Sequence, residues 1–461
     1  MKKFDLNIEK ILENWEVKHA VREIIANALD EQFLTNTDDI KIFKQGNEWI
    51  IKDFGRGLKY EHFTQKENDE KLTTSGIIGK FGIGLKDAMA TFERKGILVR
   101  IMSKYGDITL GRSQKSGFDD LVTLHAYITE PSNPYMVGTE FHLSNISDED
   151  ISAGKHLFLK FNSETVLEQV RYGSVLRNSD SQGKIYINGV LVATEENFLF
   201  SYNITYLNPT LKKALNRERT NVGRTAYAGT IKSILLECNS EEVGKLLSDD
   251  LSKFSYGDNH DEMKWVDVQN HAAEIMNKYK RVVFVTHDDI GNGMDLVNEA
   301  REGGAEIVVI PTNLRNKIVE ENQNRDGDAK VQTFHEFVQE RNQNFEYKFI
   351  EPYNLTENEK RIFNLKERLF QIIGGRPYNV HEIKISETLQ KDEYTFRSAL
   401  GLWEAEHQRI IILRTQLNSK STFLGVLLHE MAHAISGASD ATRTFENELT
   451  HLLGLVASQV L

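Results

Sequence analysis

The sequence predicts a multidomain protein of the α+β class. Its 461 residues exceed the usual size of a single domain. Apolar residues follow helical spacing in some segments and strand-like alternation in others. With 6 prolines and no Gly/Ser-rich or Pro-rich tract, the chain is expected to lack a long flexible linker.

Changes in this pattern divide the chain into four predicted domains, 1–150, 151–255, 256–350 and 351–461. The first is expected to contain a helix over 7–34, a hairpin over 40–53, a short helix after the Gly-rich stretch 76–84, and strands over 96–143. For the second we predict a helix over 163–173 and a strand region over 183–193. For the third we predict a βαβ unit whose strands are 281–287 and 305–311. The fourth is predicted to have a helical segment over 356–373, a strand over 409–415, and two helices around 427–437.

The composition limits the classes of function. The formal net charge of −12 argues against a surface that is generally coated with nucleic acid. Cys238 is the single cysteine, so a disulfide within one chain is impossible, as fits a reducing compartment. We see no signal peptide and no run of about 18 apolar residues. The sequence therefore predicts a cytoplasmic protein without a membrane partner.

Polar residues of the first domain follow a pattern suited to a nucleotide. In "EIIANALDEQ" (23–32), Glu23, Asn27 and Asp30 project from one helix face, opposite the apolar residues. Such a stripe is usually a solvated face, and only the segments that follow make it informative.

Three further segments complete this pattern. "DFGRG" (53–57) places an aspartate at the end of an apolar strand, before two glycines that allow a sharp turn. "GKFGIGLKDA" (79–88) is a Gly-rich loop that opens a helix, which offers backbone N–H groups to phosphate. "GTEF" (138–141) follows on a late strand.

In this order the four segments resemble the GHKL ATPases, the superfamily of gyrase B, the ninety-kilodalton heat-shock chaperone, histidine kinases, MutL and the MORC proteins. The resemblance covers about residues 8–145 and implies a Bergerat-type α/β sandwich that binds ATP and Mg²⁺. It implies that Asn27 ligates Mg²⁺, that Glu23 is the general base for water, and that Asp53 accepts the adenine amino group. The other residues that it places around the nucleotide are Gly55, Gly57, Gly79, Gly82, Gly84, Lys86 and Thr139. A glutamate in this role favours hydrolysis over histidine-kinase activity, and 66–76 would form the lid.

Many members of this superfamily have a transducer domain after the ATP-binding domain, and 151–255 is expected to be a transducer-like α/β domain. Its segment 215–224 contains three arginines, Arg217, Arg219 and Arg224. One of them could sense the γ-phosphate, or the segment could be a solvated basic turn. The sequence does not choose between these interpretations.

The stretch "LLHEMAHAISG" (427–437) predicts a metal site. His429 and His433 are one helical turn apart, so two imidazoles can bind one zinc ion, and Glu430 can act as general base on a metal-bound water. Apolar flanks indicate a buried helix, where histidines need partners. The alternative is a pair of core histidines without a metal.

Zinc needs a third protein ligand, for which we select Glu446 beside the apolar stripe of the next helix. Asp440 is the second choice, although it could instead cap that helix, and Glu448 also remains open. A metzincin is excluded because Ser436 and Ser439 stand where that family needs glycine and a ligand. The segment 355–461 resembles a compact gluzincin, which implies a zincin-like α+β metallopeptidase domain. Its interval between the second histidine and the glutamate is shorter than in thermolysin-like members.

Together these resemblances predict an ATP-regulated zinc metalloprotease that acts on a protein substrate. Relatives of the ATP-binding domain pair when ATP binds, so we expect a homodimer, and the combination of domains suggests a role in bacterial phage defence. The main alternative is a MORC-like clamp on DNA or protein whose zinc site is structural. Nucleic acid is a possible partner that the acidic charge does not favour. A third interpretation is a chaperone-like ATPase with a degenerate peptidase domain that only binds.

Overall fold

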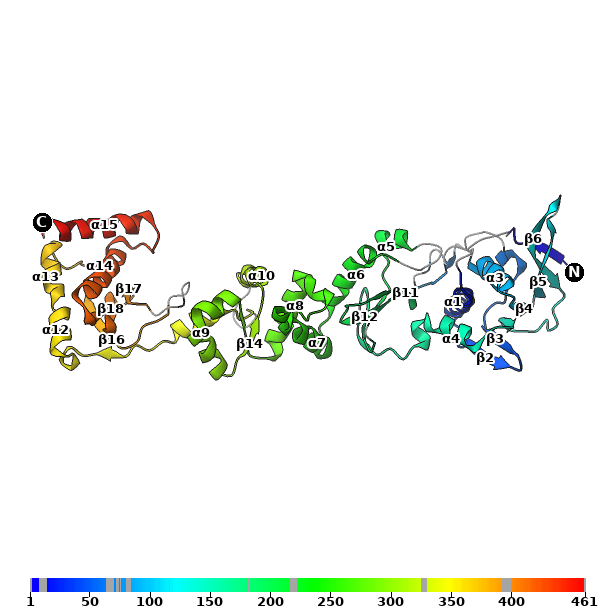
Figure 1. Cartoon of the computed structure of the whole chain (residues 1–461), viewed down its shortest axis with the longest axis horizontal. Helices are drawn as coiled ribbons and strands as arrows, with labels where there is room; N and C mark the ends of the chain where they lie inside the picture. The colour runs from blue at the N-terminus through cyan, green and yellow to red at the C-terminus, as the bar shows by residue number, and fades with distance from the viewer. Residues whose placement is uncertain are drawn as a thin grey trace. The chain divides into compact units, whose positions relative to one another are not determined.

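The computed structural model shows a mixed α+β protein with four β-sheets among the described residues (Figure 1). The described residues are 2–7, 15–63, 70–71, 74, 76–79, 84–115, 117–180, 182–215, 222–324, 330–391, 396 and 399–459. They form two compact units, one of Met1–Asp250 with Asn259–Ala272 and one of Leu251–Asp258 with Ala273–Leu461. No helix of the described residues is long and apolar enough to cross a bilayer.

The first unit begins with a seven-stranded sheet in the order β1-β6-β5-β4-β7-β3-β2. Its strands are β1 (Lys2–Asp5), β2 (Lys41–Gln45), β3 (Glu48–Lys52), β4 (Leu98–Ser103), β5 (Gly106–Lys115), β6 (Phe118–Thr129) and β7 (Thr139–Ser144). All neighbouring strands are antiparallel. The associated helices are α1 (Val17–Thr35), the 3₁₀ turn η1 (Tyr60–Phe63), α3 (Gly84–Arg94) and α4 (Asp148–His156). One apolar core joins α1, α3 and α4 to the sheet, so the helices lie on one face, as in a two-layer sandwich.

The predicted hairpin and strands of this region are confirmed, but the first helix differs from its prediction. We expected it over 7–34, whereas α1 starts at Val17 after the N-cap Glu16. Residues 8–14 lie outside the described residues. Residues 2–5 form the strand β1, which was not predicted. This strand pairs with β6 at one edge of the sheet.

The second sheet has five strands in the order β11-β10-β12-β9-β8. Its strands are β8 (Val166–Val170), β9 (Gly173–Arg177), β10 (Gly183–Ile187), β11 (Val190–Glu195) and β12 (Phe200–Ile204). Its helices are η2 (Leu159–Phe161), α5 (Pro209–Ala214), α6 (Arg224–Glu237), α7 (Glu241–Ser252), η3 (Phe254–Tyr256) and η4 (Asp261–Lys264). The helix predicted over 163–173 is wrong, because this segment pairs as the antiparallel hairpin β8–β9. Its valines favour a strand, and the pairing overrides the helical spacing of its apolar residues.

The βαβ unit of the third region is confirmed. β13 (Val282–Val285) and β14 (Glu306–Val309) are parallel and joined by α9 (His287–Glu302). The other helices of this region are α8 (Val266–Tyr279), α10 (Thr312–Asn322) and α11 (Phe334–Gln343).

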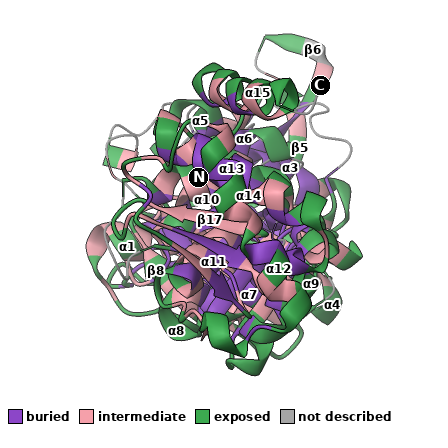
Figure 2. Cartoon of the chain, turned by 90° about the vertical axis from the view of Figure 1, so that its left-hand side faces the viewer, coloured by how far each residue is buried: buried purple, intermediate pink, exposed green. Residues whose placement is uncertain are grey.

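The C-terminal region is built on a four-stranded sheet in the order β15-β16-β18-β17. Its elements are β15 (Phe349–Ile350), η6 (Pro352–Asn354), α12 (Glu357–Phe363), α13 (Leu365–Ile372), β16 (Glu382–Ser386), β17 (Gly401–Glu404), β18 (Arg409–Leu413), η7 (Arg414–Asn418), α14 (Lys420–Ser436) and α15 (Arg443–Ser458). β15 starts just before the predicted boundary at 351 and pairs with β16. One core connects α12, α13, α14 and α15 to the sheet. α15 is largely exposed, and its buried residues are Phe445 and Leu452 (Figure 2).

Candidate metal centre and nucleotide site

Two histidines and one aspartate converge at the C-terminal end of α14. The Nε2 atoms of His429 and His433 lie 3.2 Å apart. Asp440 Oδ1 lies 3.2 Å from the Nε2 atom of His429 and 3.3 Å from that of His433. In a tetrahedral zinc site with bonds of about 2.0–2.1 Å, two ligand atoms are separated by about 3.3 Å. The three side chains therefore fit one zinc ion in both ligand type and spacing.

The surroundings orient these ligands. The ring Nδ1 of His433 lies 2.8 Å from the Ala438 carbonyl oxygen, and an N–H donated there leaves Nε2 free to ligate a metal. Phe445 stacks on the His433 ring, with centroids 4.2 Å apart. Burial lowers the pKa of His429, which favours the neutral imidazole that a metal needs.

The third member of this cluster is Asp440, the second choice from the sequence, and not Glu446. Glu446 is exposed in the first turn of α15, where Phe445 is the residue turned to the histidines. Glu448 is half-buried and is also outside the cluster. Asp440 reaches back because the chain turns sharply after α14, with Gly437 at φ +63° and Ala441 at φ +59°. A left-handed conformation at a non-glycine residue is uncommon, so this turn could not be read from the sequence.

Glu430 is also a residue of α14. Its side chain lies between this helix and the edge strand β17. Its side chain is buried, and burial raises its pKa to about 8. A hydrogen bond from the Trp403 backbone opposes this shift, whereas the charge of Asp440 adds to it. A Cβ at Gly401 would lie 2.8 Å from Glu430 Oε1, so glycine at that position leaves room for the carboxyl group.

The structure also brings the predicted nucleotide residues of α1 and α3 together. Glu23 is buried and accepts hydrogen bonds from Arg22 at 2.9 and 3.1 Å. A Cβ at Gly84, the first residue of α3, would lie 2.1 Å from Glu23 Oε2. The predicted general base is thus at the N-terminus of a helix, where the helix dipole favours an anion.

Asn27 lies one turn further along α1 and shares a cation with Asp30. Lys71 Nζ is 3.3 Å from Asn27 Oδ1 and 3.1 Å from Asp30 Oδ2. Asp30 is buried and also accepts hydrogen bonds from the backbone N–H groups of Ile78 and Gly79, both at 2.7 Å. Sequence analysis placed Asp30 on this helix face but gave it no role. In the sequence, Asp30 was marked by the polar stripe of the helix. The stripe does not predict that the backbone N–H groups of residues 78 and 79 become its hydrogen-bond donors.

Asp53 lies at the end of β3, beside Thr139 at the start of β7. The Asp53 N–H donates to the Thr139 carbonyl at 3.0 Å, and Gly55 N–H donates to Asp53 Oδ1 at 2.9 Å. Burial raises the pKa of Asp53 to about 6. Gly138 has φ +77°, and a Cβ there would lie 1.9 Å from the Asp53 carbonyl oxygen, so only glycine fits. Gly57, at φ +88°, packs against the Gly138 carbonyl in the same corner.

The remaining predicted residues have mixed outcomes. Gly82, Arg217 and Arg219 lie outside the described residues. Lys86 is buried, burial lowers its pKa, and its charged neighbours are Asp5 and Asp87. Arg224 forms ion pairs with Glu195 at 2.7 Å and with Asp261 at 2.6 Å. Arg224 and both of its partners lie in the first compact unit.

Comparison with known proteins places the chain in a family. An uncharacterized protein of Mycoplasma pneumoniae is 39% identical over 240 residues, which cover 51% of this chain and 97% of the relative. The chain belongs to the family of this mycoplasma protein. A second uncharacterized protein of M. pneumoniae is 25% identical over 309 residues, or 60% of this chain and 83% of the relative. A family model for the M. pneumoniae MPN635 N-terminal domain matches residues 149–241, which include the five-stranded sheet.

Proposed function

We propose that the chain is an ATP-regulated zinc metallopeptidase. The observation that carries this proposal is the set of separations of 3.2, 3.2 and 3.3 Å among the ligand atoms of His429, His433 and Asp440. The neighbouring buried Glu430 adds the acid–base group that peptide hydrolysis needs. A zinc ion held by these ligands would polarise the scissile carbonyl and supply an acidic bound water.

In this mechanism the protein residues position the substrate and move the proton. Glu430 accepts the proton of the attacking water and later gives it to the leaving amine. Burial raises the pKa of Glu430, and the positive charge of a bound metal would favour the carboxylate that acts as base. β17 is at the edge of its sheet, so an extended peptide can pair with it beside Glu430.

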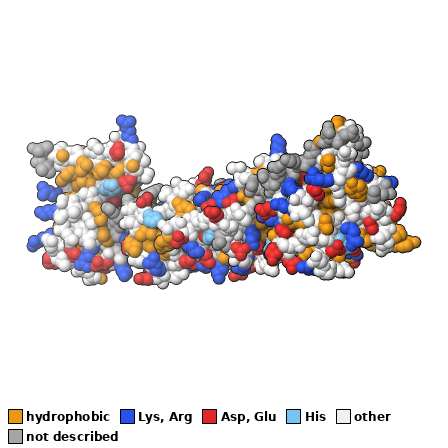
Figure 3. Space-filling model, turned by 45° about the vertical axis from the view of Figure 1, so that its right-hand side comes forward, with side chains coloured by type: hydrophobic (Ala, Val, Ile, Leu, Met, Phe, Trp, Pro, Cys, Tyr) orange, Lys and Arg blue, Asp and Glu red, His pale blue; other side chains and the backbone are white. Residues whose placement is uncertain are grey.

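For the N-terminal domain we propose a GHKL-type ATP site. The antiparallel sheet with helices on one face supports it, as does the grouping of Glu23 with Gly84 and of Asp53 with Thr139. In this proposal Asn27 ligates Mg²⁺, Glu23 activates water, and Asp53 accepts the adenine amino group. Acidic and basic side chains are interspersed on the face in Figure 3, which gives no support to a DNA clamp.

We further propose that ATP binding drives formation of a homodimer and controls the peptidase, as would suit a protease used in bacterial phage defence. The co-occurrence of the two sites supports this regulation, and a direct test is needed because co-occurrence is not coupling.

The experiment compares wild-type protein with Glu430→Ala and Glu23→Ala. The peptidase proposal predicts that Glu430→Ala abolishes cleavage of protein substrates, scored as fragments by mass spectrometry, while zinc content and ATP hydrolysis are retained. The regulation predicts that Glu23→Ala, or omission of ATP, changes the cleavage rate. Equal fragments from wild type and Glu430→Ala would overturn the peptidase, and equal cleavage with and without ATP would overturn the regulation alone.

A further inference from the structure

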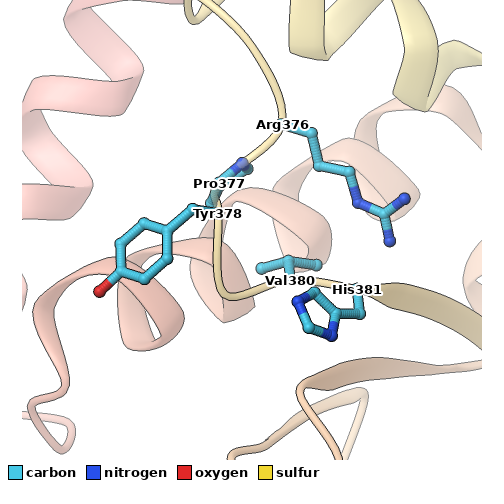
Figure 4. A pocket seen from close by; sticks show the side chains of 5 residues that line it. All are labelled: Arg376, Pro377, Tyr378, Val380 and His381. Carbon is cyan, nitrogen blue, oxygen red and sulfur yellow. The ribbon is translucent and has the colours of Figure 1, made fainter.

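The segment between α13 and β16 forms an open pocket of about 370 Å³. It is lined by Arg376, Pro377, Tyr378, Val380 and His381. The segment curls into a U with Arg376 and His381 on its two arms, whereas the Tyr378 ring projects to the outside (Figure 4). The volume is at the lower end of the about 300–1,000 Å³ of small-ligand sites, which suits one amino-acid residue.

The lining combines an apolar floor with donors that have no ionic partner. Val380 is 1% exposed and belongs to the core of this domain. Among the described residues, neither Arg376 nor His381 has an ion pair, and no acidic side chain lines the pocket. The Arg376 guanidinium lies 6.0 Å from the centroid of the Phe370 ring, which supports its position. A guanidinium without a partner presents a planar fork of N–H groups that matches a carboxylate.

The pocket is attached to the metal-binding helix. Asn379 Nδ2 donates a hydrogen bond to the carbonyl oxygen of Ala434, the residue that follows His433. Asn379 Oδ1 is buried and has no hydrogen-bond partner among the described residues. The His381 N–H donates to the Gln408 carbonyl at 2.7 Å, next to the start of β18. Asn379 and His381 thus connect the segment to the metal-binding helix α14 and to the neighbouring sheet.

We propose that Arg376 and His381 form a substrate subsite that binds a carboxylate of the peptide cleaved at the metal centre. This inference rests on the proposed peptidase function and names its substrate class. The carboxylate has two possible sources, the C-terminus of the peptide or a glutamate or aspartate side chain. In either case Arg376 provides a paired hydrogen-bond donor and Val380 contacts the apolar part of the bound residue.

The test measures binding of fluorescein-labelled peptides by anisotropy, in a Glu430→Gln background that prevents cleavage. One peptide pair differs only in glutamate against glutamine, and a second only in a free against an amidated C-terminus. The carboxylate member of one pair should bind about 10- to 100-fold tighter, as expected for a charge-assisted hydrogen bond. The pair that shows the difference identifies the source of the carboxylate.

Arg376→Met should remove this difference, His381→Ala should reduce it, and the matched control Arg361→Met, at an exposed arginine of α12, should keep it. Circular dichroism checks that each variant is folded. Equal binding within both pairs overturns the subsite, even if wild type cleaves peptides in a Glu430-dependent way. If carboxylate binding depends on Arg376 but wild type cleaves nothing, the binding site stands and the peptidase function fails.

Discussion

The carboxylate of Glu23 occupies the space that a β-carbon at position 84 would need, since that atom would lie 2.1 Å from Glu23 Oε2. Gly84→Ala should therefore displace the proposed general base while its backbone, which opens α3, remains helical. We expect ATP hydrolysis to fall by about 10²–10⁴-fold, the usual contribution of a general base. Steady-state phosphate release is the measurement.

Gly229→Ala is the matched control for this substitution. Gly229 lies in α6 with no atom within 4 Å of its missing Cβ, so alanine there should leave hydrolysis unchanged. Full activity of Gly84→Ala would show that Glu23 does not need its present position for catalysis.

Loss of either histidine should remove the metal. His429→Ala and His433→Ala each leave one imidazole and one carboxylate, too few ligands for a structural or catalytic zinc site. Zinc content measured by elemental analysis should fall from about one ion per chain to near zero. His451→Ala, at an exposed histidine of α15, should keep full content. Wild-type protein that contains no zinc after expression with added zinc would remove the basis of the metal centre.

The identity of the third ligand can be decided with two single variants. Asp440→Ala removes the oxygen that lies 3.2 Å from His429 Nε2, so zinc affinity should fall at least about tenfold. Glu446→Ala changes an exposed side chain outside the cluster and should leave the affinity unchanged. Competition with a chromogenic chelator gives both constants, and the reverse ranking would restore Glu446 as the ligand.

Sequence analysis predicted the histidine pair but not the third ligand, for a physical reason. The spacing of His429 and His433 is a property of one helix, which any regular α-helix reproduces. The position of Asp440 depends on the turn between α14 and α15, in which Gly437 and Ala441 have left-handed conformations. The same limit explains the segment 163–173, where the predicted helix is a strand because β9 pairs with it. The predictions of the β2–β3 hairpin and the β13–α9–β14 unit are confirmed. Each of these units is indicated by a hydrophobic pattern within one short stretch of sequence.

Asp53 should make the stability of the first unit depend on pH. Its pKa of about 6 exceeds the usual value of 3.8, so between these pH values the folded protein keeps a proton that the unfolded chain releases. The free energy of unfolding therefore decreases as pH rises through this window, by at most about 3 kcal/mol. In Asp53→Asn this contribution is absent.

Urea unfolding of both proteins between pH 4 and 6, followed by fluorescence, measures the difference between their slopes. Parallel pH profiles would show that Asp53 titrates normally. A variant at the exposed Asp38, such as Asp38→Asn, should keep the wild-type slope.

The Lys71 ammonium between Asn27 and Asp30 has a consequence for the cycle proposed above. In that proposal a Mg²⁺ ion bound by Asn27 would lie where this ammonium now offsets the charge of the buried Asp30. The lysine and the ion would compete for the Asn27 oxygen, so each binding event would first have to displace Lys71 from it.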